Sequence, residues 1–279
     1  MVKDKSIESS VPTEVTPPRM VYIPEGAFLM GTSNKQIMHL VEVEDWAEEW
    51  QEKGLFRIEQ PQYKINVPGF SICATPVTNA EYNLFVWETN YRAPRQWGGF
   101  RFPEGLGDHP VVGVAKPDAE AYCQWLSEQL GDEYRLPNEI EWEKAARGED
   151  GRMYPWGNEF DPWRCNTLES GRKSTTPVGN YSPGGDSIYG ISDMVGNVFE
   201  WTSSYLRQYP YKSNQDAVED GGDKTLRCVV RGGAWYYSRK LGRCAAREGA
   251  IPSFVSPALG FRVASSQAKF NEKTKTDES

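Results

Sequence analysis

Residues 229–263 read VVRGGAWYYSRKLGRCAAREGAIPSFVSPALGFRV, and this stretch decides the fold. It opens on two valines before Arg231-Gly232-Gly233 and closes on Gly260 followed by Phe261-Arg262-Val263. Short apolar runs bounded by glycines are typical of strands, so we expect a strand at each end, with Trp235 and Phe261 in the core. The residues between follow neither helical nor strand periodicity. Because loops held by rigid strands concentrate binding and catalysis, we expect the functional residues here.

The composition favours a loop-rich α+β protein over a helical bundle. The chain has 279 residues, of which 26 are glycine and 19 are proline, and 13% are aromatic. Its formal net charge of -8 argues against a broad nucleic-acid-binding surface. No apolar run reaches the ~18 residues that a membrane helix needs, and the first residues lack the apolar core of a signal peptide. We therefore expect a cytoplasmic protein that binds neither nucleic acid nor membrane.

The chain has five cysteines, at positions 73, 123, 165, 228 and 244. Their number is odd, they are widely spaced and no CxxC pair occurs. This spacing favours buried free thiols over a disulfide framework.

Outside the opening stretch, the pattern predicts one domain over residues 19–265, with disordered polar segments at 1–18 and 266–279. Residues 20–23 and 28–30 are predicted to pair as a hairpin, and residues 65–72 form a further strand. A helix is expected over 37–51, where acidic residues accompany an apolar face. Three more helices are expected, from Thr78 with Glu81 completing a capping box, from 119 to Gly131, and over 139–147.

Several motifs occur in a fixed order and identify a family. They are MVYIPEGAFLMG at 20–31, PVTN at 76–79, HPV at 109–111, RLPNEIEWE at 135–143, YPWG at 154–157 and GNVFEW at 196–201, followed by the Arg231 and Arg262 motifs. This order resembles the formylglycine-generating-enzyme, or sulfatase-modifying-factor, domain over nearly all of 20–264. The resemblance implies an α+β, C-type-lectin-like single domain rich in irregular loops. It also implies that residues 229–263 build the ligand or substrate surface.

The family's oxidases hold copper between two cysteines in the loop after the RGG-aromatic turn, because soft thiolates select Cu(I). In this chain the first position falls at or beside Tyr237 and the second near Leu241. Cys244 belongs to the RCAAR motif at 243–247, which resembles a packed framework segment. We therefore expect no copper, and the pattern leans against catalysis.

A second branch of the family uses a three-histidine iron site for sulfur insertion. This chain has two histidines, His39 and His109, so such a site cannot be assembled from them. We interpret His109 as a turn residue before Pro110 and His39 as part of the acidic helix.

Residues 190–201, GISDMVGNVFEW, resemble the family's calcium loop. A hard cation prefers oxygen ligands, which Asp193 and Glu200 would supply as carboxylates and Gly196 and Val198 as carbonyls. A second site is indicated at Asn166 and Glu169. Either ion would be structural. The alternative is that Asp193 and Glu200 only cap turns.

The resemblance and the missing thiols lead to the functional hypothesis of a non-catalytic binding protein. The variable proteins of diversity-generating retroelements share this C-terminal frame, with varied stretches that correspond to 236–240 and 248–258. Tyrosine and arginine anchor many protein interfaces, and an exposed Ile251/Phe254/Val255 cluster would indicate a protein or other macromolecular partner. The predicted ligand-binding residues are Tyr236, Tyr237, Ser238, Arg239, Lys240, Glu248, Ala250, Ile251, Ser253, Phe254, Val255, Ser256 and Ala258. The alternatives are a formylglycine-generating-type oxidase or related metal-dependent oxidoreductase, and a structural subunit of a larger assembly.

Overall fold

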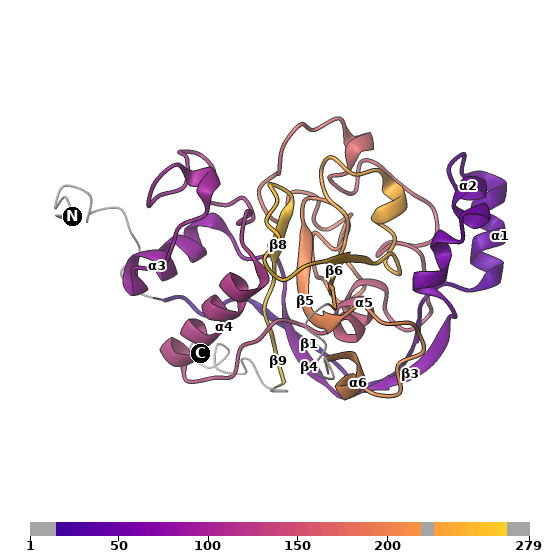
Figure 1. Ribbon diagram of the computed structural model, residues 1–279, viewed down its shortest axis with the longest axis horizontal. Coiled ribbons are helices and arrows are strands. Elements are labelled where there is room, and N and C mark those ends of the chain that lie inside the picture. Colours follow the sequence, from indigo (N-terminus) through magenta and orange to yellow (C-terminus); the bar gives the residue numbers. More distant parts are fainter. Residues whose placement is uncertain (1–14, 219–225, 267–279) are drawn as a thin grey trace, which may run out of the picture.

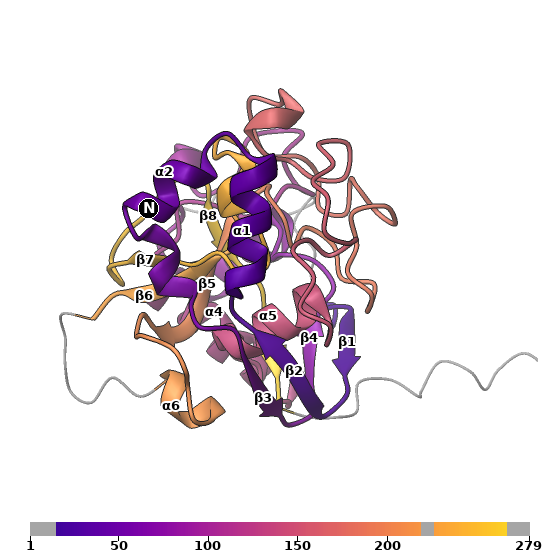
Figure 2. The same ribbon diagram turned by 90° about the vertical axis from the view of Figure 1, so that its right-hand side faces the viewer.

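The computed structural model describes residues 15–218 and 226–266, in which six α-helices surround three small sheets (Figures 1 and 2). The largest sheet has the strand order β7 (Glu248–Ala250), β6 (Cys228–Arg231), β5 (Phe199–Tyr205) and β8 (Leu259–Phe261). β5 pairs antiparallel with β6 and parallel with β8, so that Glu200 lies opposite both Arg231 and Gly260. The expected strands at the two ends of the opening stretch are therefore confirmed.

The N-terminal strands pair differently from the prediction. β1 (Met20–Ile23) pairs with β4 (Phe70–Cys73), which also pairs with β9 (Ala264–Ser265). β2 (Gly26–Met30) pairs instead with β3 (Tyr63–Val67). The predicted hairpin of 20–23 with 28–30 is thus wrong, and the single strand over 65–72 is two strands separated by Pro68-Gly69. A proline has no N–H to donate to a ladder, which explains the break.

The predicted helix over 37–51 is also two helices, α1 (Asn34–Val43) and α2 (Ala47–Glu52), followed by the 3-10 turn η2 (Leu55–Glu59). α1 begins at a capping box of Ser33 with Gln36 and ends at Glu44, whose backbone is extended. The Glu44 carboxylate accepts hydrogen bonds from the Trp46 indole and from Arg239, which lies far away in the sequence. A tertiary contact therefore coincides with the interruption of an otherwise continuous helical pattern.

The other helices follow the prediction closely, because their signals are local. α3 (Asn79–Thr89) has the expected Thr78–Glu81 capping box, and α5 (Glu139–Arg147) begins at Asn138. α4 (Lys116–Leu130) starts three residues before the predicted position, where Asp118 accepts the Ala115 N–H at 2.9 Å, and it ends at Gly131 with φ 74°. α6 (Asn214–Val218) is a further short helix, and η3 (Arg95–Trp97), η4 (Leu168–Ser170) and η5 (Arg239–Leu241) are 3-10 turns in the loops.

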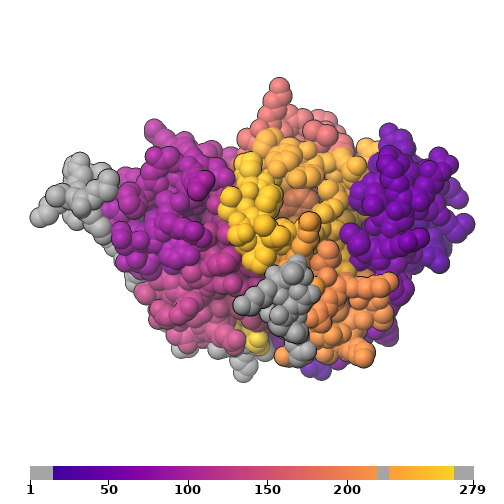
Figure 3. Space-filling view, viewed as in Figure 1, coloured from indigo at the N-terminus to yellow at the C-terminus, as the bar shows by residue number. Residues whose placement is uncertain are grey.

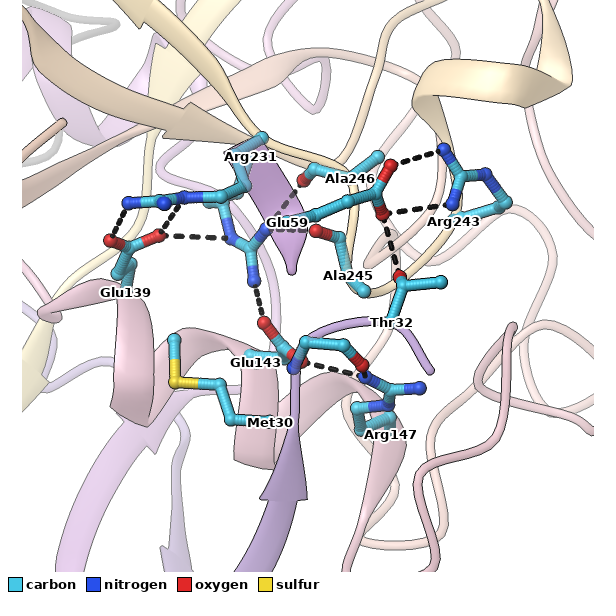
Figure 4. Close-up of polar contacts among 12 residues, drawn as sticks. Met30, Thr32, Glu59, Glu139, Glu143, Arg147, Arg231, Arg243, Ala245 and Ala246 are labelled. Carbon is cyan, nitrogen blue, oxygen red and sulfur yellow. Dashed lines mark hydrogen bonds and ion pairs between the residues drawn. The ribbon is translucent and has the colours of Figure 1, made fainter. Parts of the chain in front are cut away.

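An ionic network fills the space between α5 and the end of β6 (Figure 4). Glu143 pairs with Arg147 and with Arg231, whose guanidinium also donates to the carbonyls of Ala245 and Ala246. These charged side chains are fully buried. A buried charge must be paired and hydrogen-bonded, so the network specifies how residues 241–247 lie against α5.

All five cysteines are free and buried, which confirms the expectation. Phe261 lies in the core with 0% of its surface exposed. The predicted disordered segments lie mostly outside the described residues, in 1–14 and 267–279. Val15 packs against the core, and Ser266 accepts a hydrogen bond from Arg135 at 3.0 Å. Within the described part of the chain, no helix is both long and apolar enough to cross a membrane.

Candidate ligand-binding surface

The C-terminal segment forms the centre of one face of the molecule. Figure 3 shows it in yellow between the α1–α2 helices in indigo and the chain around α3 in magenta. The two predicted binding stretches meet on this face, because the Tyr236 hydroxyl lies 3.1 Å from the Ser256 hydroxyl. The structure therefore brings the start of 236–240 against the end of 248–258, just before β8 begins.

The first stretch begins with a row of aromatic rings. The rings of Tyr236 and Tyr237 stack with their centroids 4.6 Å apart, and Trp235 meets Tyr236 edge-on at 4.7 Å. Tyr237 in turn packs edge-on against Phe199 of β5 at 5.0 Å. All three rings of the row are half-buried, so Trp235 is not the core residue that the sequence predicted. Its indole N–H instead points to the Pro257 carbonyl at 3.4 Å.

The second stretch carries the exposed apolar side chains. Ile251, Phe254 and Val255 expose 52%, 48% and 46% of their surfaces. Glu248 and Ser253 are also exposed, and Ala250 is half-buried. An exposed cluster of this kind is typical of a surface that meets a partner.

Ser256 and Ala258 are corrections to the predicted binding set, because both are buried. The Ser256 carbonyl accepts the Gly113 N–H at 3.0 Å, and the Ala258 carbonyl accepts the Phe199 N–H at 2.8 Å. These residues lead the chain into β8 and belong to the framework. The sequence did not separate them from their exposed neighbours because the stretch has no strand periodicity.

The two cations of the first stretch face α1 and α2. Arg239 Nε donates to Glu44 Oε2 at 2.7 Å, Nη2 forms an ion pair with the same oxygen at 2.7 Å, and the guanidinium carbon lies 5.7 Å from the Phe160 ring centroid. The Lys240 ammonium lies 5.5 Å from the Trp50 ring. Ser238 caps the η5 turn that carries them. The acidic helices thus contribute to this surface, which the sequence analysis did not predict. The excess of acidic residues over 42–49 was the sequence feature that could have indicated a contact with Arg239 and Lys240.

The turn predicted to bind calcium holds two carboxylates in different surroundings. Glu200 does not fit a cation site, because its oxygens accept from Arg262 Nε at 2.6 Å, Arg262 Nη2 at 2.7 Å and Trp142 Nε1 at 2.8 Å. Within the described part of the chain, Asp193 accepts one hydrogen bond, from the Gly179 N–H at 2.7 Å, and burial raises its pKa to about 6. Asp193 lies with Gly196 and Val198 in one turn, so calcium binding there stays a prediction that rests on Asp193 and backbone carbonyls.

The second predicted calcium position is a hydrogen-bonded turn. Asn166 donates to the Ser174 carbonyl at 3.0 Å and to Asn197 Oδ1 at 3.3 Å. One oxygen of Glu169 accepts the Arg239 backbone N–H at 2.9 Å, and the other is buried without a hydrogen-bond partner. Glu169 therefore connects to the binding surface through Arg239.

Residues 6–267 match the family model of the sulfatase-modifying factor enzyme 1-like domain. The chain belongs to this family. It is 30% identical over 307 residues to the formylglycine-generating enzyme of Bos taurus, covering 89% of this chain and 75% of that protein. It is 33% identical over 264 residues to the inactive C-alpha-formylglycine-generating enzyme 2 of Bos taurus, covering 74% and 80%. Treponema denticola variable protein 1 shares the fold, with a TM-score of 0.69 at 20% identity over 89% of this chain and 95% of that chain.

Sulfatase-modifying-factor oxidases need two thiols on this face, and the structure places other groups there. Tyr237 is the half-buried ring described above, and Leu241 is buried beneath the surface. Cys244 has 0% of its surface exposed, and burial raises its pKa to about 12. His109 contacts Thr175 at 2.9 Å, and His39 lies near Glu159, on separate parts of the molecule. Among the described residues, no three His, Cys, Asp or Glu side chains gather as a metal site would require.

Proposed function

We propose that this protein binds a ligand without catalysis, through the surface of residues 236–240 and 248–255. The observation that supports the proposal most is that this face carries exposed apolar side chains and lacks the pair of thiols that the family's oxidases use. The family's thiol positions fall at or beside Tyr237 and near Leu241, while Ile251 and Phe254 present apolar surface to solvent on the same face. Rigid aromatic and apolar side chains at a framework surface are typical of protein-binding sites.

The retroelement-variable class is the form of this proposal that we favour. Its support is the shared frame around 231–262 and the fold shared with a protein named a variable protein. The ligand would then be a protein or another macromolecule, bound in the cytoplasm. The DNA tests this assignment. We expect a near-copy of the gene segment that encodes the C-terminal stretch beside a reverse-transcriptase gene, with differences confined to codons of exposed positions. Differences concentrated in codons for buried residues such as Ala258 would contradict it.

The oxidase is the alternative, and the identity to formylglycine-generating enzymes gives it weight. We expect the purified protein, incubated with copper and a CxPxR peptide, to leave the peptide mass unchanged, because no thiol pair reaches the surface to hold Cu(I). Mass spectrometry of the peptide measures this, with an active formylglycine-generating enzyme as the positive control. Conversion of the peptide cysteine to an aldehyde would overturn the binding-only proposal.

A further inference from the structure

The Arg239 side chain lies among Glu44, Asp45 and Phe160, which together form its seat. This seat is built like a guanidinium-binding site. Two N–H groups of its planar side chain converge on Glu44, each at 2.7 Å, while Phe160 lies against the guanidinium at 5.7 Å. Asp45 adds a second carboxylate 3.7 Å from Nη2. Nε and Nη2 both reach Glu44 Oε2. A guanidinium can direct two N–H groups to one acceptor while its flat face packs on an aromatic ring, and this separates arginine recognition from lysine recognition.

The seat offers more polar atoms than Arg239 uses. Among the described residues, the buried Tyr154 hydroxyl has no hydrogen-bond partner, and the Tyr154 ring packs against Phe160 at 5.6 Å. The second oxygen of Glu169 is also buried without a donor, while its first oxygen holds the Arg239 backbone. Buried polar atoms without partners are rare in native proteins, and these two belong to residues that contact Phe160 and the Arg239 backbone.

The walls of the seat are held by contacts that do not involve Arg239. The Trp46 indole donates to the same Glu44 oxygen at 2.8 Å, and the Glu44 backbone N–H donates to Leu40 at 2.8 Å. Trp46 packs edge-on against Trp50 at 5.3 Å, and Phe160 packs against Tyr154 at 5.6 Å. The carboxylate and the ring would therefore keep their places if residue 239 were shortened.

We propose that Glu44, Asp45 and Phe160 form a guanidinium-binding site that Arg239 fills in this chain, and that the site takes an arginine side chain of a polypeptide ligand when residue 239 is short. The ligand class rests on the proposed function, since 239 is one of the positions assigned to the binding surface. Residue 239 then determines specificity: arginine closes the site, and a small residue opens it to an arginine-bearing partner.

Chemical rescue tests the site without knowledge of the ligand. Arg239→Ala leaves the Glu44 carboxylate without its cation, and ethylguanidinium should refill the seat. We expect a saturable shift of the Trp46 indole N–H resonance and a rise of several degrees in melting temperature in Arg239→Ala. The wild type should show neither, and ethylammonium at the same concentration should give a several-fold smaller response. Absence of a saturable response to ethylguanidinium in folded Arg239→Ala would overturn the proposal.

Two further variants keep the result specific. Arg239→Ala combined with Glu44→Gln should lose the response, and an equal response in the double variant would also count against the site. Arg152→Ala, which removes the partner of the more exposed carboxylate of Asp150, is the matched control and should give no ethylguanidinium response. If Arg239→Ala does not fold, Arg239→Ser replaces it, with the same expected response. Because the assay uses no macromolecular ligand, its failure leaves the proposed binding function standing, and a failed binding function leaves this assay unaffected.

Discussion

Asp193 and Glu200 show how two carboxylates of one turn-and-strand segment acquire different chemistry. Glu200 is neutralised by Arg262 and hydrogen-bonded by Trp142, so its charge is fully compensated inside the protein. Asp193 has one backbone donor, and its raised pKa, about 6, reflects the cost of burying the carboxylate. A bound cation at Asp193 would offset that cost, whereas Glu200 already has its counter-ion.

This contrast predicts the behaviour of Asp193→Asn. With chelator present, the variant should melt at or above the wild-type temperature, because asparagine can accept the same Gly179 N–H without a buried charge. With calcium present, the wild type should gain stability by mass action while the variant gains none. Thermal melting with and without calcium measures both effects, and Asp150→Asn, at an exposed carboxylate, should keep the calcium response. If the melting curve of the wild type is the same with and without calcium, Asp193 only caps the turn and binds no ion.

At the scale of elements, what could be predicted from the sequence depended on how local the signal was. The Thr78–Glu81 capping box lies within one turn of helix and was predicted, as was the end of α4 at Gly131. The interruption of the helical pattern at Glu44 could not be predicted, because it coincides with a contact to Arg239, far away in the sequence. The prediction of strand pairing was wrong for the same reason, because β2 pairs with β3, which follows it only after the whole α1–α2 segment.

The binding segment followed this rule as well. The sequence indicated which residues lie between the two strands, and Ile251, Phe254 and Val255 are indeed exposed. It could not show that Ser256 and Ala258 turn inward, since their burial depends on Gly113 and on β5. A surface position and a framework position here are only a few residues apart.

Substitutions within this segment should therefore differ sharply in cost. Phe254→Ala should change the free energy of unfolding by no more than about 0.5 kcal/mol, because the ring is half exposed. Ala258→Leu should destabilise by roughly 1–3 kcal/mol through overpacking, and Phe261→Ala by about 3–5 kcal/mol through a core cavity. Urea denaturation measures all three. A cost for Phe254→Ala that approaches that of Phe261→Ala would mean that the segment is packed and not displayed.

At the scale of the whole molecule, buried arginines satisfy backbone that the small sheets leave unpaired. Arg262 donates to the carbonyls of Cys73 and Ser192, and Arg247 donates to those of Ile58 and Arg207. Buried carbonyls need donors, and an irregular chain cannot obtain them from a ladder. These side chains therefore join loops that are far apart in the sequence. All five cysteines are buried in the resulting structure.

The burial of the cysteines predicts that their thiols react slowly in the native protein. Burial raises the pKa of Cys73 to about 11 and that of Cys165 to about 12, so neither forms the reactive thiolate in mildly alkaline buffer. The native protein should leave a thiol-disulfide exchange reagent unreacted, and all five thiols should react only after denaturation. Absorbance of the released chromophore measures this. Rapid reaction of even one thiol in the native protein would identify an accessible cysteine and favour the oxidase alternative.

The position of the loop between β7 and β8 determines how much that loop can be lengthened. Residues 251–258 join β7 to β8 of the same four-stranded sheet, so strands hold both ends of this loop. The entropy of closing such a loop grows only with the logarithm of its length, so doubling a flexible loop costs only about 0.6 kcal/mol. Insertions among the exposed residues 253–255 should thus be tolerated with the framework unchanged. This fold can accept foreign peptides there, as a display scaffold whose anchor points are already closed.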